Sequence, residues 1–148
     1  MTAFDAKDPD YHAKASSIIE RQAAMRTLGV AIGRIAPGVV ELTMPYAQAY
    51  TQQNGFLHAG IVTTVLDTAC GCAAFTLMPA GANVLTVEFK TNLLAPARGE
   101  RFVFRAHVLK PGRTLTVCEA QAFALDKDGE RLIASMTGTL MAILARAP

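Results

Sequence analysis

Asp67 is the residue of this sequence with the clearest potential for chemistry. It stands in the middle of a run from Gly60 to Leu77 in which almost every other residue is apolar or small. A carboxylate in such surroundings can attack a carbonyl carbon or activate a water molecule that does so. The alternative is structural: Asp67 could instead accept hydrogen bonds from Thr63 or Thr64 and only fix the packing of two helices.

The run that contains Asp67 is predicted to form a long buried helix over residues 60–77. At the start of a helix the backbone N–H groups lack partners within the helix and lie at the positive end of its dipole. The N–H groups of Ala59 and Gly60 can therefore hold a developing oxyanion. His58 comes directly before them, and the residues alone leave two roles open for it, a helix cap or a part in the chemistry.

Asp67 and Ala59 are too far apart to act together within one chain. A helix rises about 1.5 Å per residue, so the two residues lie about 12 Å apart along the axis. Asp67 shares its side of the helix with small residues, which allow another helix to approach closely: Thr63, Thr64, Gly71 and Ala74. Two copies packed antiparallel about a two-fold axis would bring each Asp67 near the helix start of the other copy. We therefore predict an obligate homodimer with shared sites.

Charge and composition exclude several classes of protein. The 148 residues suffice for one domain with a real core and are too few for two. Lys and Arg number 14 against 12 Asp and Glu, for a net charge of +2, and the basic residues form no cluster. Proteins that bind nucleic acids depend on such clusters, so we expect no nucleic-acid partner.

The sequence also argues against a membrane protein and a metal site. The run 60–77 is about long enough to span a bilayer, but a carboxylate in its middle costs ~2.5–3.5 kcal/mol on insertion. The first residues, MTAFDAKDPDYHAK, lack the basic patch and apolar stretch of a signal peptide, so we expect a cytoplasmic protein. Cys70, Cys72 and Cys118 lack the spacing of a zinc module. We expect buried free thiols, no metal and no membrane partner.

Around the central helix the sequence predicts a single α+β domain over residues 1–148. An amphipathic helix capped by Asp8 is predicted at about residues 9–27, and the core follows at about 30–144. Alternation of apolar and polar residues predicts six strands, at 30–36, 39–44, 82–94, 100–109, 114–125 and 131–144.

The links between the later strands indicate how the sheet is built. Segments 95–99, 110–113 and 126–129 are rich in turn residues, so we expect each to join antiparallel neighbours. An antiparallel sheet of about six strands has one face to bury, and the helix at 60–77 is the element apolar on nearly every side. The sheet should therefore wrap around that helix.

Three stretches of the chain form an ordered set of residues. They are Gln52…Leu57-His58-Ala59-Gly60…Leu66-Asp67-Thr68-Ala69, Val87-Glu88-Phe89…Leu94-Ala95-Pro96-Ala97…Gly99 and Val108-Leu109-Lys110-Pro111-Gly112-Arg113-Thr114. This set, over roughly residues 30–144, resembles the hotdog-fold acyl-CoA thioesterases of the PaaI (phenylacetic acid degradation) type. The resemblance implies a hotdog fold and hydrolysis of an acyl- or aryl-CoA to the free acid and CoA, with no metal or other cofactor. It leaves open whether dimers pair into tetramers.

The resemblance also implies roles for the residues around the helix start. Asp67 matches the catalytic carboxylate, either nucleophile or general base. His58 matches the histidine that orients the thioester carbonyl. Ala59 stands where the family's first glycine donates its N–H to that carbonyl. Alanine keeps the N–H group but not a backbone angle that is available only to glycine.

Other matches extend the site on both sides. Gln52 stands where the family often has asparagine, with Asn54 as a nearby substitute, and Thr86 matches a Ser or Thr that holds the attacking water in some members. Since CoA carries phosphates, we expect basic or hydroxyl side chains at the pocket mouth; the candidates are Lys110, Arg113, Thr114, Lys90 and Arg98. A solvated surface charge is the alternative for each basic candidate. Candidates for the acyl pocket are Tyr46, Tyr50, Phe56, Phe75 and Met78.

Two other functions fit the same fold. One is a non-catalytic module that binds or senses acyl-CoA, but a binder gains nothing from a charge such as Asp67 against a neutral thioester. The other is a dehydratase, for which the chain lacks a stretch like His-x-x-x-x-Pro-x-x-Pro. The leading interpretation is the thioesterase.

Overall fold

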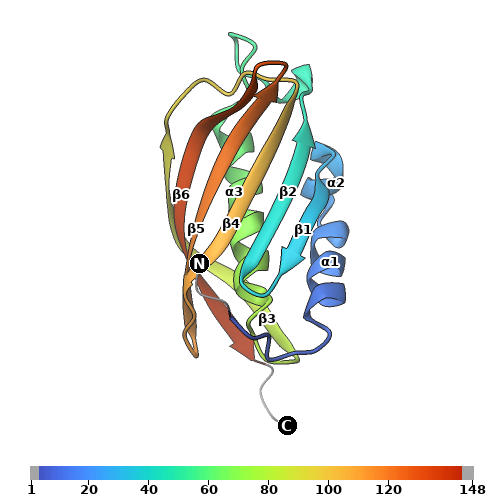
Figure 1. The fold of residues 1–148 in the computed structure, drawn as a ribbon, viewed down its shortest axis with the longest axis vertical. Coiled ribbons are helices and arrows are strands. Elements are labelled where there is room, and N and C mark those ends of the chain that lie inside the picture. Colours follow the sequence, from blue (N-terminus) through green and yellow to red (C-terminus); the bar gives the residue numbers. More distant parts are fainter. Residues whose placement is uncertain (1–3, 145–148) are drawn as a thin grey trace.

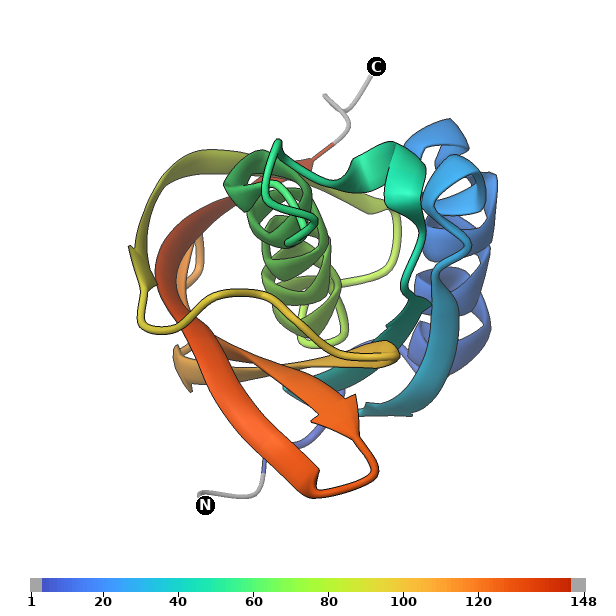
Figure 2. The ribbon, with the colours of Figure 1, turned by 90° about the horizontal axis from the view of Figure 1, so that it is seen from above.

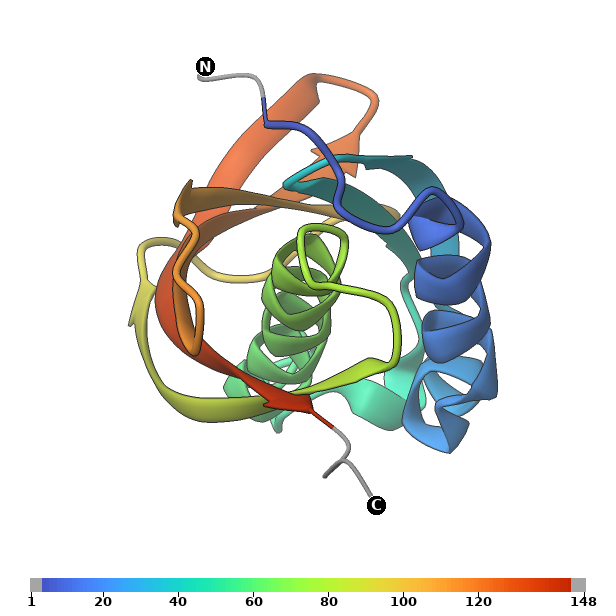
Figure 3. The ribbon, with the colours of Figure 1, turned by 90° about the horizontal axis from the view of Figure 1, so that it is seen from below.

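A six-stranded antiparallel sheet curves around one helix in the computed structural model, which describes residues 4–144 (Figure 1). The strands are β1 (Ala31–Ala36), β2 (Val39–Pro45), β3 (Ala82–Leu93), β4 (Arg101–Lys110), β5 (Leu115–Asp126) and β6 (Gly129–Leu144). Their spatial order is β1-β2-β4-β5-β6-β3. Views from the two ends of the central helix show the sheet wrapped around it (Figure 2, Figure 3). The predicted hotdog architecture is confirmed.

The central helix is α3 (Ala59–Phe75), close to the predicted 60–77. Most of its surface is apolar, so the strands can pack against it from several directions. Leu66 from the helix and Leu42, Phe102 and Phe104 from the sheet are completely buried in this core. The core therefore lies between the concave face of the sheet and α3.

The N-terminal helix predicted over 9–27 as one element is two helices, α1 (Tyr11–Arg21) and α2 (Ala23–Leu28). Gln22 between them has an extended backbone, with ψ 114°. Its side-chain Oε1 accepts a hydrogen bond from Thr68 Oγ1 on α3, 3.1 Å away. This tertiary contact accompanies the break. The predicted cap by Asp8 is wrong: α1 begins at Tyr11 with Asp10 at the N-cap position and no capping side chain. Asp8 Oδ1 instead accepts a hydrogen bond from Asp10 N at 2.9 Å, one turn before the helix.

The link at 95–99 is not the expected turn between neighbouring strands. It reverses the chain direction, but β3 pairs with β6 and β4 pairs with β2 and β5. Residues 94–100 instead cross the N-terminal end of α3, and we call them the crossover segment (Figure 2). Leu57 N donates to Ala97 O at 3.0 Å, which fastens this segment to the start of the helix. The other two predicted turns do join neighbours.

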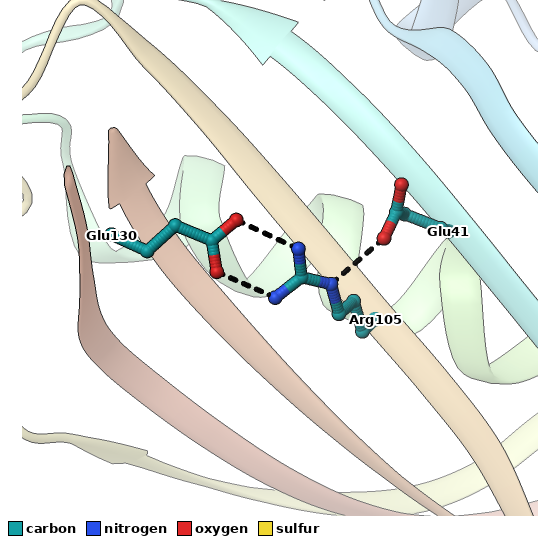
Figure 4. Close-up of polar contacts among 3 residues, drawn as sticks. All are labelled: Glu41, Arg105 and Glu130. Atoms are coloured by element: carbon teal, nitrogen blue, oxygen red, sulfur yellow. Dashed lines mark hydrogen bonds and ion pairs between the residues drawn. The ribbon is translucent and has the colours of Figure 1, made fainter. Parts of the chain in front are cut away.

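On the outer face of the sheet, Arg105 of β4 holds two carboxylates (Figure 4). Its Nε donates to Glu41 on β2 at 2.7 Å, and its two terminal nitrogens donate to Glu130 on β6 at 2.8 and 2.7 Å. The guanidinium also lies 4.8 Å from the centre of the Phe123 ring. Hydrogen bonding to Arg105 lowers the pKa of Glu130. These contacts tie β2, β4 and β6 together.

Candidate active site

His58 caps α3, and its imidazole closes the first turn of the helix. Nδ1 accepts a hydrogen bond from Gly60 N at 3.0 Å, while His58 N donates to Tyr50 O at 2.9 Å. Gly60 makes room for the ring, since a Cβ there would lie 3.2 Å from Nδ1. In a neutral imidazole an accepting Nδ1 leaves the proton on Nε2. The cap therefore fixes a tautomer whose Nε2–H remains available as a donor.

Ala59 supplies the open backbone donor of the first turn. The N–H groups of Gly60, Ile61 and Val62 all bond to His58, whereas that of Ala59 has no partner within residues 4–144. We expected both Ala59 and Gly60 to present free N–H groups, but the His58 side chain occupies the second. No non-glycine residue among those described has positive φ. Ala59 thus meets no strain that a glycine would relieve.

An apolar cavity of about 440 Å³ adjoins this helix start. Its walls come from the turn before α3, the first turns of α3, the crossover segment and β6; they include Gln52, Phe56, Ala59, Val62, Leu94 and Ile133. Gln52 is the one polar side chain among the cavity's lining residues. A cavity of this size and polarity suits the apolar part of a small ligand.

Only Phe56 of the five expected acyl-pocket residues lines this cavity. Tyr46 borders a separate polar cavity, Tyr50 donates through its hydroxyl to Thr27 O, and Phe75 and Met78 are buried in the core. Sequence reasoning missed Ile133 and treated the crossover segment only as a turn. No local sequence pattern identifies these residues as cavity walls, because their position depends on how the chain runs from β3 to β4.

Asp67 lies half-buried near the middle of α3 and is held by β3. Thr86 Oγ1 donates to Asp67 Oδ1 at 2.7 Å. Thr63 and Thr64 make no hydrogen bond to Asp67 within residues 4–144, and Thr64 Oγ1 donates to Gly60 O instead. The second carboxylate oxygen, Oδ2, has no partner in the described part of the chain. Asp67 is thus oriented through one oxygen while the other remains open.

The remaining candidates lie at different places. Gln52 Oε1 accepts a hydrogen bond from Asn54 N, which closes the turn before α3, and Asn54 does not line the apolar cavity. Lys90 donates to Asn92 on β3 at 2.8 Å. Arg98 lies in the crossover segment and borders the polar cavity of about 560 Å³ beside Tyr46 and Gly55.

Lys110, Arg113 and Thr114 belong to the β4–β5 hairpin, near the C-terminal end of α3. Arg113 and Gly112 line a separate cavity of about 450 Å³ together with Leu77, which follows that end of the helix. Since β4 is about 30 Å long and begins beside the crossover segment, the hairpin is remote from Ala59. Within one chain, therefore, the hairpin residues do not reach Ala59. Asp67 does not reach it either, since the two lie about 12 Å apart along the helix.

The cysteines near Asp67 are not alternative nucleophiles. Cys70, Cys72 and Cys118 are buried free thiols, as predicted. Burial raises the pKa of Cys72 and of Cys118 to about 12, and that of Cys70 as well. At neutral pH these thiols stay protonated, and a thiol in that state is unreactive.

Comparison with known proteins places the chain in a family. Residues 54–130 match the family model described as the thioesterase superfamily. The chain belongs to the thioesterase superfamily. A solved thioesterase family protein from Silicibacter pomeroyi is 61% identical, with a TM-score of 0.90 over 91% of this chain and 99% of that one. The protein is a thioester hydrolase of the hotdog fold.

Two further matches connect this thioesterase to proteins with named roles. Acyl-coenzyme A thioesterase 13 of Homo sapiens is 35% identical over 92 residues, which are 61% of this chain and 65% of that protein. The PaaI protein of the E. coli phenylacetic acid degradation operon is 18% identical, with a TM-score of 0.81 over 93% and 96% of the two chains. At that identity the comparison with PaaI shows a shared fold, and the predicted resemblance to hotdog-fold thioesterases is confirmed. Within residues 4–144 no helix of this thioesterase has the length and apolar character needed to cross a membrane.

Proposed function

We propose that this thioesterase hydrolyses an acyl- or aryl-CoA thioester to the free acid and CoA. The observation that carries the proposal is the Ala59 N–H, which lacks a partner within residues 4–144 and belongs to a residue that lines the apolar cavity. A thioester carbonyl bound there has its acyl group beside apolar walls. The name of the human relative supports CoA as the thiol part of the substrate.

The chemistry follows from the two polar groups of the helix start. The thioester oxygen accepts hydrogen bonds from Ala59 N–H and from His58 Nε2–H, so the negative charge that develops on it is stabilised at the positive end of the α3 dipole. Asp67 as general base takes a proton from water while the water oxygen attacks the carbonyl carbon. The C–S bond then breaks, and the CoA thiolate leaves and takes up a proton. Asp67 as nucleophile would instead form an anhydride that water hydrolyses.

This chemistry requires a second copy of the chain. Asp67 of one subunit can meet the Ala59 N–H of the other if two copies pack with their α3 helices antiparallel. The free edge of β3 supports such packing: it has no partner strand within residues 4–144 and exposes Val87 by 51% and Phe89 by 45%. Such an apolar edge favours pairing with another chain.

Replacement of Asp67 by Asn tests its role. The amide has almost the shape of the carboxylate but neither attacks nor accepts the proton, so we expect kcat to fall by about 10²-fold or more, with the dimer and the melting temperature retained. Glu20→Gln is the matched control, because Glu20 is an exposed carboxylate of α1 outside the proposed site and interface and its loss should leave kcat unchanged. A purely structural Asp67 gives the reverse result, a weaker dimer or lower melting temperature with activity that follows the folded fraction.

Mixed dimers test whether the site is shared. One chain carries Asp67→Asn and the other Ala59→Phe, and the heterodimer is purified through two different affinity tags. With shared sites, one site of each heterodimer has both defects and the other has neither, so about half of the wild-type activity returns. A stable heterodimer that stays as inactive as its parents would disprove the proposed meeting of Asp67 and Ala59 across the interface.

A further inference from the structure

Strand β6 contains one extra residue at Ile133. Ala134 pairs with Ala122 of β5 and Leu132 pairs with Phe123, so Ile133 has no partner residue on β5. Such a bulge changes the direction in which a side chain points. The Ile133 carbonyl accepts hydrogen bonds from Leu94 N at 2.9 Å and from Ala95 N at 3.2 Å. The backbone of the bulge therefore anchors the start of the crossover segment.

The same residue belongs to the buried part of the lining of the apolar cavity. The Ile133 side chain is 1% exposed, and it lines the cavity together with Leu57 and Val62, which are also buried. Leu93 and Leu94, at the other side, are more than half exposed and form the rim. No charged side chain lines the cavity within the described part of the chain. Anything that enters past the rim therefore meets a closed apolar floor.

We propose that Ile133 sets the size of the acyl group that this enzyme accepts, and that this group is uncharged and apolar. The inference rests on the proposed function, because a carbonyl oxygen bound at Ala59 N–H directs the acyl group into the cavity that Ile133 closes. A charged acyl group would lose its hydration there without a counter-charge. Because the Ile133 anchor is a backbone carbonyl, side-chain variants change the depth of the cavity and keep the hydrogen bonds to the crossover segment.

The test compares butanoyl-CoA with decanoyl-CoA in wild type, Ile133→Ala and Ile133→Phe. The measured quantity is the ratio of kcat/KM for decanoyl-CoA to that for butanoyl-CoA. Ile133→Ala enlarges the cavity and should raise this ratio by about tenfold, whereas Ile133→Phe fills the cavity and should lower it by about tenfold. The matched control is Ile35→Ala, the same change at a buried residue of β1 outside the cavity, which should leave the ratio unchanged. A ratio that stays within twofold of wild type in both Ile133 variants would overturn the proposal.

A second measurement separates this proposal from the proposed function. If wild type hydrolyses no acyl-CoA, the proposed function is wrong, and the cavity is then tested with the non-hydrolysable thioethers S-butyl-CoA and S-decyl-CoA by titration calorimetry. Ile133→Ala should favour the decyl compound and Ile133→Phe the butyl compound. Ile133→Val replaces Ile133→Ala if the latter does not fold, with a smaller shift in the same direction. Equal affinities across the variants would refute the role of Ile133.

Discussion

The two halves of α3 differ in how much of their surface the rest of the chain covers. In the first half, residues 59–67, Gly60 and Thr64 are exposed and Asp67 is half-buried. In the second half, residues 68–75, every residue is buried, and most are small, so that strands pack closely against them. The first half of the helix thus carries the polar groups of the candidate site beside the core residues Val65 and Leu66, whereas the second half only packs against the sheet.

The largest effect should come from the buried half. Phe75→Ala removes a large side chain from the core and should lower the free energy of unfolding by about 3–5 kcal/mol, measured by urea denaturation. The kcat of the protein that remains folded should not change. Asp67→Asn should show the opposite pattern, so the pair of variants tests the division directly. A fall in kcat of folded Phe75→Ala by tenfold would mean that the two halves are coupled.

The next largest effect concerns the β4–β5 hairpin, which lies near the buried half of α3 but would contribute to substrate binding. If Lys110 and Arg113 bind CoA phosphates of a site in the other subunit, their replacement by Ala should raise KM by about tenfold at low salt and leave kcat nearly unchanged. The control with the same loss of charge is Arg21→Ala with Arg26→Ala, on α1 and α2. An unchanged KM would leave the hairpin charges as solvated surface groups.

The smallest effect should come from the outer face, far from both halves of α3. Glu130 and Arg105 are each about 40% exposed, so Glu130→Gln should lower the free energy of unfolding by only about 0.2–1 kcal/mol at pH 7. Because Arg105 lowers the pKa of Glu130 from its usual 4.5, this contribution exists above that value and disappears as pH falls through the lowered pKa. Urea denaturation of both proteins at pH 7 and pH 3 measures the difference. A difference of equal size at both pH values would contradict the ion pair as its source.

Most of the fold follows from local patterns, whereas its exceptions depend on contacts distant in sequence. Apolar runs and alternation located α3 and all six strands. The break at Gln22 accompanies a contact with Thr68, 46 residues away, and the sequence of residues 9–27 does not indicate it. The sequence did not indicate the crossover because a five-residue link normally joins neighbouring strands, while here β3 pairs with β6.

The site was predictable in its residues and less so in its contacts. The spacing of His58 and Gly60 indicates a helix start, and Asp67 stands out by its charge. Which N–H remains free depends on the side-chain orientation of His58, and the Ile133 bulge depends on strand register. The proposed meeting of Asp67 with Ala59 involves a second chain. Helix geometry predicts it from the sequence, and one folded copy does not contain it.

The path of the crossover segment also determines when the domain can close during synthesis. Within residues 4–144 the strand that pairs with β3 is β6, so a growing chain that has already made β3 must add about forty more residues before that pairing can begin. Until then the apolar surface of α3 lacks part of its cover. Contacts between segments this distant in sequence slow folding and prolong the exposure of apolar surface. Because one sheet encloses the helix, the nascent chain passes through a long interval in which it is prone to aggregate or to be bound by chaperones.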